Sequence, residues 1–134
     1  MRLKQVVPLA AALLCSAAPA HAAPAPAQVV VVEVCVDEKA AASIENRVTA
    51  PLEKLLLKLP NVADLQSMTF EGVVRFELLY TDGAGRSELA AAQEAIGRAA
   101  IAPGVRILSR SAQLAWPSPD GLFFAKRGCA AARP

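Results

Sequence analysis

Alternating apolar positions mark the start of the part of the chain that we expect to fold. Residues 29–36 read VVVVEVCV, and one side of this segment consists of Val30, Val32, Val34 and Val36. The opposite side carries Val29, Val31, Glu33 and Cys35. Successive residues of a strand point to opposite faces. The pattern therefore predicts a strand with one face in the core and a second, partly covered face that holds a charge.

A helical pattern follows this strand. We expect Asp37 to be the N-cap, and Glu38 suits the positive end of a helix. Large apolar residues then recur at steps of four, four, three, one and three, which places them in one stripe: Ile44, Val48, Leu52, Leu55, Leu56 and Leu59. Pro60 ends the pattern.

Pro51 lies inside this stripe. An interior proline removes one backbone hydrogen bond and costs roughly 3 kcal/mol. Because the apolar stripe continues past Pro51, we predict one kinked or loosened helix. A second helix that begins with Pro51 in its first turn is the alternative.

Two strands and a turn are predicted next. Residues 61–70 form the first of them, and Glu71-Gly72 is a turn signal. The following segment, VVRFELLYTD, alternates strictly. One side is apolar and the other polar, with Val74, Phe76, Leu78 and Tyr80 opposite Arg75, Glu77 and Thr81. A strand with one wet face is typical of an antiparallel sheet.

The last predicted elements are a helix and a strand. Residues 86–100 carry Leu89, Ala92, Ile96 and Ala99 at helical spacing, and Pro103-Gly104 interrupts the pattern. Residues 105–108 form the fourth strand, and a continuation to residue 114 is compatible with the pattern. The order predicts an α+β, ferredoxin-like βαββαβ fold over residues 29–111, with two helices on one face of a four-stranded antiparallel sheet. Residues 112–134 form a C-terminal extension.

The N-terminal segment has the layout of a secretory signal. Two positive charges precede an uncharged apolar stretch over residues 6–18, and Ala20-His21-Ala22 is a small-x-small cleavage pattern. We predict a signal peptide over residues 1–22, a Pro/Ala linker over residues 23–28 and a periplasmic location. An uncleaved inner-membrane anchor is the alternative. Leu14 before Cys15 disfavours a lipoprotein.

Charge and histidine content exclude several classes of function. Removing Arg2 and Lys4 with the signal leaves twelve basic and twelve acidic residues, so no positive face for nucleic acid is expected. His21 is the single histidine and lies in the cleavage pattern. Catalysis by histidine and histidine-containing metal sites are therefore not expected. We expect neither an enzyme nor a cofactor; an enzyme would need carboxylate pairs such as Glu45 with Glu53 or Asp82 with Glu88, which usually form a solvated face.

Two cysteines, Cys35 and Cys129, remain after cleavage. In an oxidising compartment such a pair favours a disulfide. The alternative is a buried Cys35 that acts as a small apolar residue and a free Cys129.

Several short motifs together resemble a known family. Glu45-Asn46-Arg47-Val48-Thr49 continues into Pro51-Leu52-Glu53-Lys54 and then Leu59-Pro60-Asn61-Val62. Glu71-Gly72, Asp82-Gly83 and Pro103-Gly104-Val105 follow in the same order. With these motifs, residues 29–108 resemble the first porter subdomain of resistance-nodulation-division (RND) efflux permeases. The residues that match the family motif are Glu45, Val48, Pro51, Leu52, Glu53, Gly72, Asp82 and Gly83.

The resemblance implies a role in efflux without transport by this subdomain alone. A proline at Pro51 is part of the family pattern, which favours a structural interpretation over a mobile hinge. In the pumps, proton coupling needs charged residues in membrane-spanning helices, which an isolated porter subdomain does not contain. Asp37-Glu38-Lys39-Ala40 also replaces the glycine-containing turn common in the family. We therefore expect no substrate-contacting residue to carry over.

We expect a non-enzymatic accessory, partner-binding or relic component of an efflux system. Its partner would be an RND permease or another periplasmic protein, with membrane contact only through the signal segment. The alternative is an independent periplasmic module that binds a small ligand or a protein. A large pocket lined by aromatic residues would favour that alternative: Phe70, Phe76, Tyr80 or Trp116.

The sheet face opposite the helices needs a cover in a separate subdomain. We hypothesise that Leu122-Phe123-Phe124 packs on this face or adds to an edge of the sheet, fixed by a Cys35–Cys129 bond. Metal export is part of the family, but Met68 and two cysteines are the soft ligands left after cleavage, so a dedicated copper site is not expected. A Cys35/Cys129 thiolate pair is the exception, and it excludes the disulfide.

Overall fold

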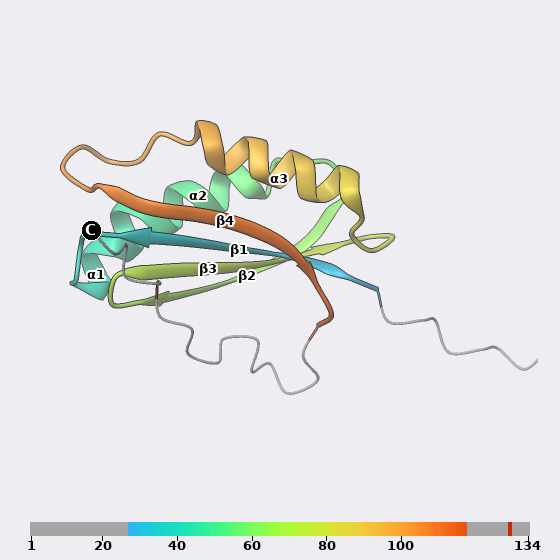
Figure 1. Ribbon diagram of the computed structural model, residues 1–134, viewed down its shortest axis with the longest axis horizontal. Helices are drawn as coiled ribbons and strands as arrows, with labels where there is room; N and C mark the ends of the chain where they lie inside the picture. The colour runs from blue at the N-terminus through green and yellow to red at the C-terminus, as the bar shows by residue number, and fades with distance from the viewer. Residues whose placement is uncertain (1–26, 118–128, 130–134) are drawn as a thin grey trace, which may run out of the picture.

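The computed structural model describes residues 27–117 and residue 129. Its elements are β1 (Val29–Val36), α1 (Ala41–Ile44), the π-helical η1 (Glu45–Thr49), α2 (Ala50–Leu56), β2 (Val62–Phe70), β3 (Val73–Tyr80), α3 (Arg86–Arg98) and β4 (Ile107–Ala115). The four strands form one sheet in the order β2-β3-β1-β4, and each neighbouring pair is antiparallel. The helices lie on one face of this sheet (Figure 1). The predicted α+β, ferredoxin-like arrangement is confirmed.

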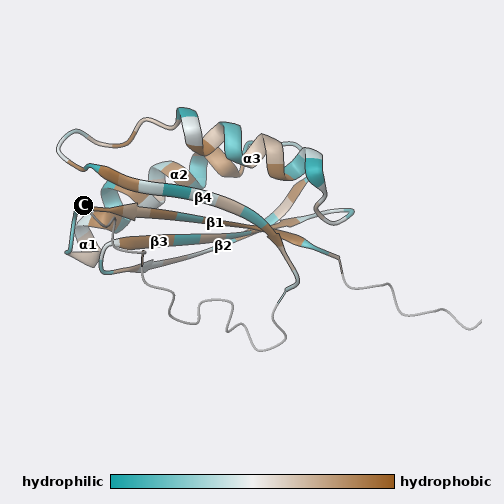
Figure 2. Ribbon diagram, in the orientation of Figure 1, coloured by the Kyte–Doolittle hydropathy of each residue, from teal (hydrophilic) through white to brown (hydrophobic). Residues whose placement is uncertain are grey.

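The core lies between the helices and the inner face of the sheet. Figure 2 shows hydrophobic stretches along β1, and both hydrophobic and hydrophilic stretches along α3. Most of the apolar positions predicted for this face are buried: Val30, Val32, Val34, Val36, Val74, Phe76, Leu78 and Tyr80 from the strands, and Ile44, Val48, Leu52, Leu56, Ala92 and Ile96 from the helices. The remaining positions of the two helical stripes are partly buried and pack against this core: Leu55, Leu59, Leu89 and Ala99. Burying a large apolar side chain stabilises a fold by about 1.5–3 kcal/mol. This packing fixes the position of the helices relative to the sheet.

Pro51 is accommodated by a change of helix type. The segments α1, η1 and α2 follow one another without a break, which confirms the single loosened helix. In η1, the Ala50 N–H bonds to the Glu45 carbonyl, five residues back. Pro51 has no N–H for the Arg47 carbonyl, and this carbonyl accepts a bond from the Ala102 N–H instead, with an N···O distance of 3.4 Å.

The predicted N-cap at Asp37 is wrong. The helix begins at Ala41, and Ala40 stands at the cap position without a side-chain bond. The Asp37 carboxylate instead accepts from the Arg106 N–H at 2.8 Å, because the end of β1 pairs with the segment before β4. Glu38 caps the approach to the helix, since its carboxylate accepts from the backbone N–H groups of residues 39 and 40.

The alternation predicted that the polar side of β3 is exposed to solvent, but this side is buried. Arg75 is 4% exposed and Glu77 is 7% exposed, whereas Thr81, beyond the strand, is exposed. Val31 and Cys35 of the neighbouring β1 are also buried on this side. Burial of Arg75 is tolerated because its Nε lies 2.6 Å from the Glu33 carboxylate. We call this side of β1 and β3 the outer face.

Some boundaries differ from the predicted ones. The helix α3 ends at Arg98, before residue 100, and β4 begins at Ile107 rather than residue 105. Between them, residues 103–104 form a turn in which Gly104 has a φ of +86°, a conformation that glycine adopts without strain. The strand β4 runs to Ala115, four residues beyond residue 111, where the predicted ferredoxin-like fold ends.

Several predictions fall on residues outside the described part. The signal peptide at residues 1–22, residues 23–26 of the linker and the segment Leu122-Phe123-Phe124 belong to this group. Within residues 27–117 and at residue 129, no helix combines the length and the apolar character that a membrane crossing requires.

Candidate functional site

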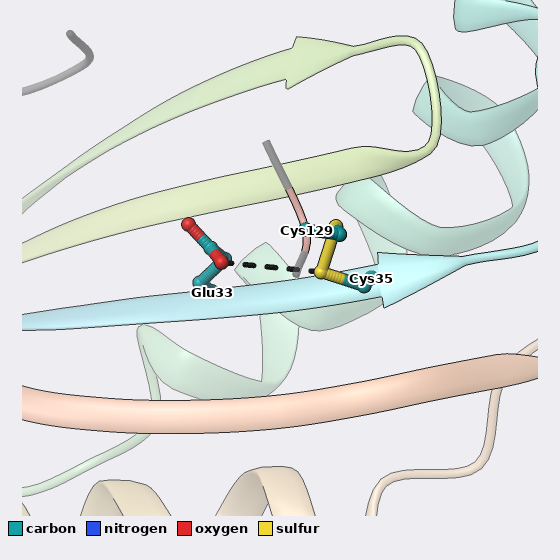
Figure 3. A group of neighbouring side chains, drawn as sticks. All are labelled: Glu33, Cys35 and Cys129. Atoms are coloured by element: carbon teal, nitrogen blue, oxygen red, sulfur yellow. Dashed lines mark hydrogen bonds between the residues drawn. A yellow bond between two sulfur atoms is a disulfide. The ribbon is translucent and has the colours of Figure 1, made fainter. Parts of the chain in front are cut away.

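A disulfide joins the outer face of the sheet to the C-terminal part of the chain. Cys35 of β1 and Cys129 are bonded, with their Cα atoms 5.9 Å apart (Figure 3). The predicted pairing is therefore confirmed, and the alternative of two free thiols is wrong. Cys35 points to the outer face because its neighbours Val34 and Val36 point into the core.

Glu33 lies beside this disulfide. One oxygen of its carboxylate, Oε2, is 2.6 Å from the Arg75 Nε, and the other, Oε1, is 3.9 Å from the Cys35 Sγ. The register explains this contact, since Glu33 of β1 stands directly opposite Arg75 of β3. On the other side, the Cys129 Sγ is 3.5 Å from the Gly72 carbonyl oxygen. Sequence alternation placed Glu33 and Cys35 on one face, but it gave no signal for the approach of Cys129.

Glu77 also faces outward, one alternate position further along β3. It stands opposite Val31 in β1 and Gln66 in β2, so no cation is its direct cross-strand neighbour. Burial raises the pKa of the Glu77 carboxyl. The outer face thus combines a paired charge, a disulfide and an acid that is costly to ionise.

The family-motif residues do not form one site. Gly72 lies in the turn before β3, and Asp82 and Gly83 follow its other end. Val48 and Leu52 are buried in the core. These positions lie on different parts of the fold, and their requirements are structural. Gly83, for example, has a φ of +79°, and an added Cβ would come within 2.8 Å of Ala27.

The carboxylates of the motif connect the helix to β2. Glu45 accepts from the Thr69 hydroxyl, which lies 2.8 Å from the buried Thr49 hydroxyl. Glu53 accepts a short bond from the Ser67 hydroxyl. Glu45 and Glu53 therefore each anchor the helix to a different residue of β2.

The second carboxylate pair, Asp82 and Glu88, lies on either side of the start of α3 in the sequence. Glu88 accepts from the Gly85 N–H at 2.8 Å and from the Ser87 hydroxyl at 2.9 Å. Bonds from backbone N–H groups, together with that hydroxyl, lower the pKa of Glu88. This geometry is that of a helix-capping acid.

A groove runs between α2 and α3. It has a volume of about 570 Å³ and is lined by Pro51, Leu52, Lys54, Leu55, Lys58, Leu59, Ala91, Glu94, Ala95, Arg98, Ala99 and Ala100. Its lining is mostly apolar, and its charged residues are Lys54, Lys58, Glu94 and Arg98. Arg98 pairs with Glu94 at 2.8 Å. Among the described residues, Lys54 and Lys58 have no ion pair, so the groove carries an excess of positive charge.

Sequence reasoning missed this groove. A sequence signal for the groove was present in and after α2. Leu55 and Leu59 lie at the edge of the apolar stripe, and Lys54 and Lys58 precede them directly in the sequence. The partner surface of α3 could not be read from the stripe alone, because the contact depends on how the two helices pack.

The aromatic pocket that would favour an independent ligand-binding module is not found in this groove. Phe76 and Tyr80 are buried in the core, and Phe70 and Trp116 are partly exposed elsewhere. None of the four lines the groove between α2 and α3.

Comparison with known proteins supports the RND resemblance at the level of the fold. No protein-family model matches the sequence, and the comparison with curated proteins gives no match. Among solved structures, the chain is similar to a heavy metal efflux pump, with 24% sequence identity and a TM-score of 0.52. The match covers 62% of this chain and 9% of the pump chain. The chain thus shares the fold of a part of a heavy metal efflux pump, and at this identity the likeness shows the fold alone.

Proposed function

We propose that the protein is a secreted, non-enzymatic accessory component of an efflux system, which binds an RND permease and does not itself pump. The observation that carries this proposal is the fold, which is shared with a domain that makes up 9% of a heavy metal efflux pump. In the pump, the matched part lies within a much larger chain and therefore adjoins other parts of it. The layout of residues 1–22 supports a periplasmic location.

The groove between α2 and α3 is the surface that we assign to the permease. Its apolar lining includes Leu55 and Leu59, and burying these side chains against a partner would be favourable. Lys54 and Lys58 at its rim favour an acidic partner, because complementary charges increase the rate and specificity of association. The proposed occupant is therefore an acidic segment of the permease with an apolar side.

Co-purification tests this assignment. Tagged protein, with its disulfide intact, is incubated with detergent-solubilised membranes that contain an RND heavy-metal permease from the same organism. We expect the permease to be retained by the wild-type protein. The charge reversal Lys54→Glu/Lys58→Glu should reduce retention about tenfold or more, since it places like charges across the interface.

A matched control changes the same charges elsewhere. Lys39→Glu/Arg86→Glu alters two exposed basic residues that do not line the groove. This variant should retain the permease as well as the wild type does. Equal retention by both double variants would contradict the assignment of the groove to the permease. No retention of a permease by the wild type would contradict the accessory function.

A further inference from the structure

We propose that the dithiol form of this protein binds a thiophilic divalent cation at Glu33, Cys35 and Cys129. The Cys35–Cys129 disulfide would then act as a redox control on metal binding. This inference rests on the outer face alone and does not depend on the proposed contact with a permease.

The three ligand atoms already lie together. One carboxylate oxygen of Glu33 and the Sγ atoms of Cys35 and Cys129 are all within 4.8 Å of one another (Figure 3). In a tetrahedral site, thiolate and carboxylate ligands lie about 2.0–2.3 Å from a zinc ion, so the ligand atoms are roughly 4 Å apart. Breaking the S–S bond lets the two sulfur atoms separate to that spacing with small side-chain rotations.

Arg75 holds the carboxylate in a suitable orientation. Its Nε binds the Glu33 Oε2 at 2.6 Å, which leaves Oε1 directed toward the Cys35 Sγ. A ligand fixed by a second hydrogen-bond partner is typical of metal sites. Cys35 is 1% exposed and the Arg75 side chain 5% exposed, so solvent competes weakly for the sulfur and for this ion pair.

The charge balance favours a divalent cation. Two thiolates and the Glu33 carboxylate carry three negative charges, and Arg75 carries one positive charge. A divalent ion brings this half-buried group to neutrality, whereas a monovalent ion leaves it negative. Two sulfur ligands with one oxygen suit zinc or cadmium better than magnesium or calcium.

The redox step is a thiol–disulfide exchange. A dithiol reductant attacks the Cys35–Cys129 bond, gives up two electrons and two protons, and leaves as a cyclic disulfide, while the protein gains two thiols. Binding of the cation then releases these two protons as the thiolates form M–S bonds. In the reverse direction a disulfide oxidant takes up the two electrons and two protons and leaves as thiols, while the S–S bond between Cys35 and Cys129 forms again and the divalent ion is released.

Cadmium binding tests the proposal. The full secreted chain is reduced with a phosphine, which is converted to its oxide by water as the disulfide opens, and the phosphine is removed without air. Titration with Cd²⁺ is followed by thiolate-to-cadmium absorption in the ultraviolet and by calorimetry. We expect one Cd²⁺ per reduced chain and binding at least roughly 100-fold weaker for the oxidised chain, because both thiolate ligands are then absent.

Two variants and the melting temperature provide further tests of the metal site. Glu33→Gln should weaken binding about 10- to 100-fold, whereas Glu77→Gln, on the same face but outside the ligand group, should leave it unchanged. In circular dichroism, Cd²⁺ should raise the melting temperature of the reduced wild type and not of the oxidised form. Absent binding by the reduced chain, equal binding by the oxidised chain, or equal affinities of Glu33→Gln and Glu77→Gln would overturn the proposal.

Discussion

At the scale of single residues, Arg47 explains how the helix accepts Pro51. Its carbonyl, which loses the Pro51 N–H, accepts from the Ala102 N–H at 3.4 Å. Its guanidinium donates to the Pro103 carbonyl. The cost of an interior proline is largely the cost of an unpaired carbonyl and of steric crowding, and the π-helical turn relieves both. The family-like proline is therefore a built-in part of the contact between the helix and the 101–104 loop.

Replacing this proline should consequently have little effect. We expect Pro51→Ala to change the free energy of unfolding by less than about 1 kcal/mol, because the Arg47 carbonyl is already bonded. Urea denaturation measures the change. Lys54→Pro, in the regular turn that follows, should lose roughly 3 kcal/mol or more. A gain of roughly 3 kcal/mol from Pro51→Ala would show that the π-helical turn does not relieve the proline.

Glu77 should make stability depend on pH. Burial raises its pKa above the ordinary value of 4.5, so the folded state binds the proton more tightly than the unfolded state does. The contribution of Glu77 to stability is then most favourable below pH 4.5 and is lost as the pH rises through the raised pKa. We expect Glu77→Gln, which is never charged, to raise the melting temperature near neutral pH and to leave it unchanged in acid. A scan of melting temperature against pH decides this, with the exposed Glu71→Gln as control.

At the scale of elements, hydroxyl groups of β2 attach the helix to the sheet. Thr49 is fully buried, and its hydroxyl lies 2.8 Å from that of Thr69, which also donates to Glu45. This contact lies beside the π-helical turn, where the regular helix bonds are rearranged. It is therefore suited to hold the register between η1 and β2.

The Thr49–Thr69 contact should be measurable by a double-mutant cycle. Thr49→Val keeps the shape and removes the hydroxyl, at a cost of about 1 kcal/mol. Thr69→Val should cost a similar amount, and the double variant should lose less than the sum, because the two hydroxyls share one bond. Strict additivity in urea denaturation would mean that this bond contributes nothing.

Periodic patterns predicted most of the elements. The alternation around Val74 and Phe76 and the stripe around Ile44 and Leu52 record burial directly, because a residue that faces the core must be apolar. The N-cap was mispredicted because Asp37 finds its partner in Arg106, far along the chain. Local sequence cannot reveal such a partner.

The candidate sites were less predictable than the elements. From the sequence we expected Arg75 to be exposed, because a lone charge on an alternating strand usually faces solvent. Its partner Glu33 lies 42 residues away in the sequence. The pairing of Cys35 with Cys129 followed from the count of cysteines and not from geometry. Its closeness to Glu33 required the register of the strands.

At the scale of the whole molecule, the disulfide closes nearly the full length of the folded chain. Cys35 and Cys129 are 94 residues apart, and a loop of this length contributes about 4–5 kcal/mol in the chain-entropy model. We expect reduction to lower the free energy of unfolding by about this amount in guanidinium denaturation. The Cys35→Ser/Cys129→Ser variant should match the reduced protein and should not respond to reductant. Unchanged stability on reduction would contradict a structural role for the bond.

The molecule as a whole presents two distinct surfaces. The helical side carries a groove with excess positive charge at Lys54 and Lys58, and the outer face of the sheet carries the disulfide beside Glu33. The first surface is assigned to a permease and the second to a metal ion. Because they lie on opposite sides of the sheet, the two assignments can be tested independently.

Site-specific photo-crosslinking in intact cells shows whether the protein binds a permease through its helical side. A photoreactive residue replaces Glu94, which is exposed and lines the groove, or Leu108, which is 48% exposed on β4. We expect an adduct with an RND permease from position 94 and none from position 108. No permease adduct from position 94, or equal adducts from both positions, would contradict it.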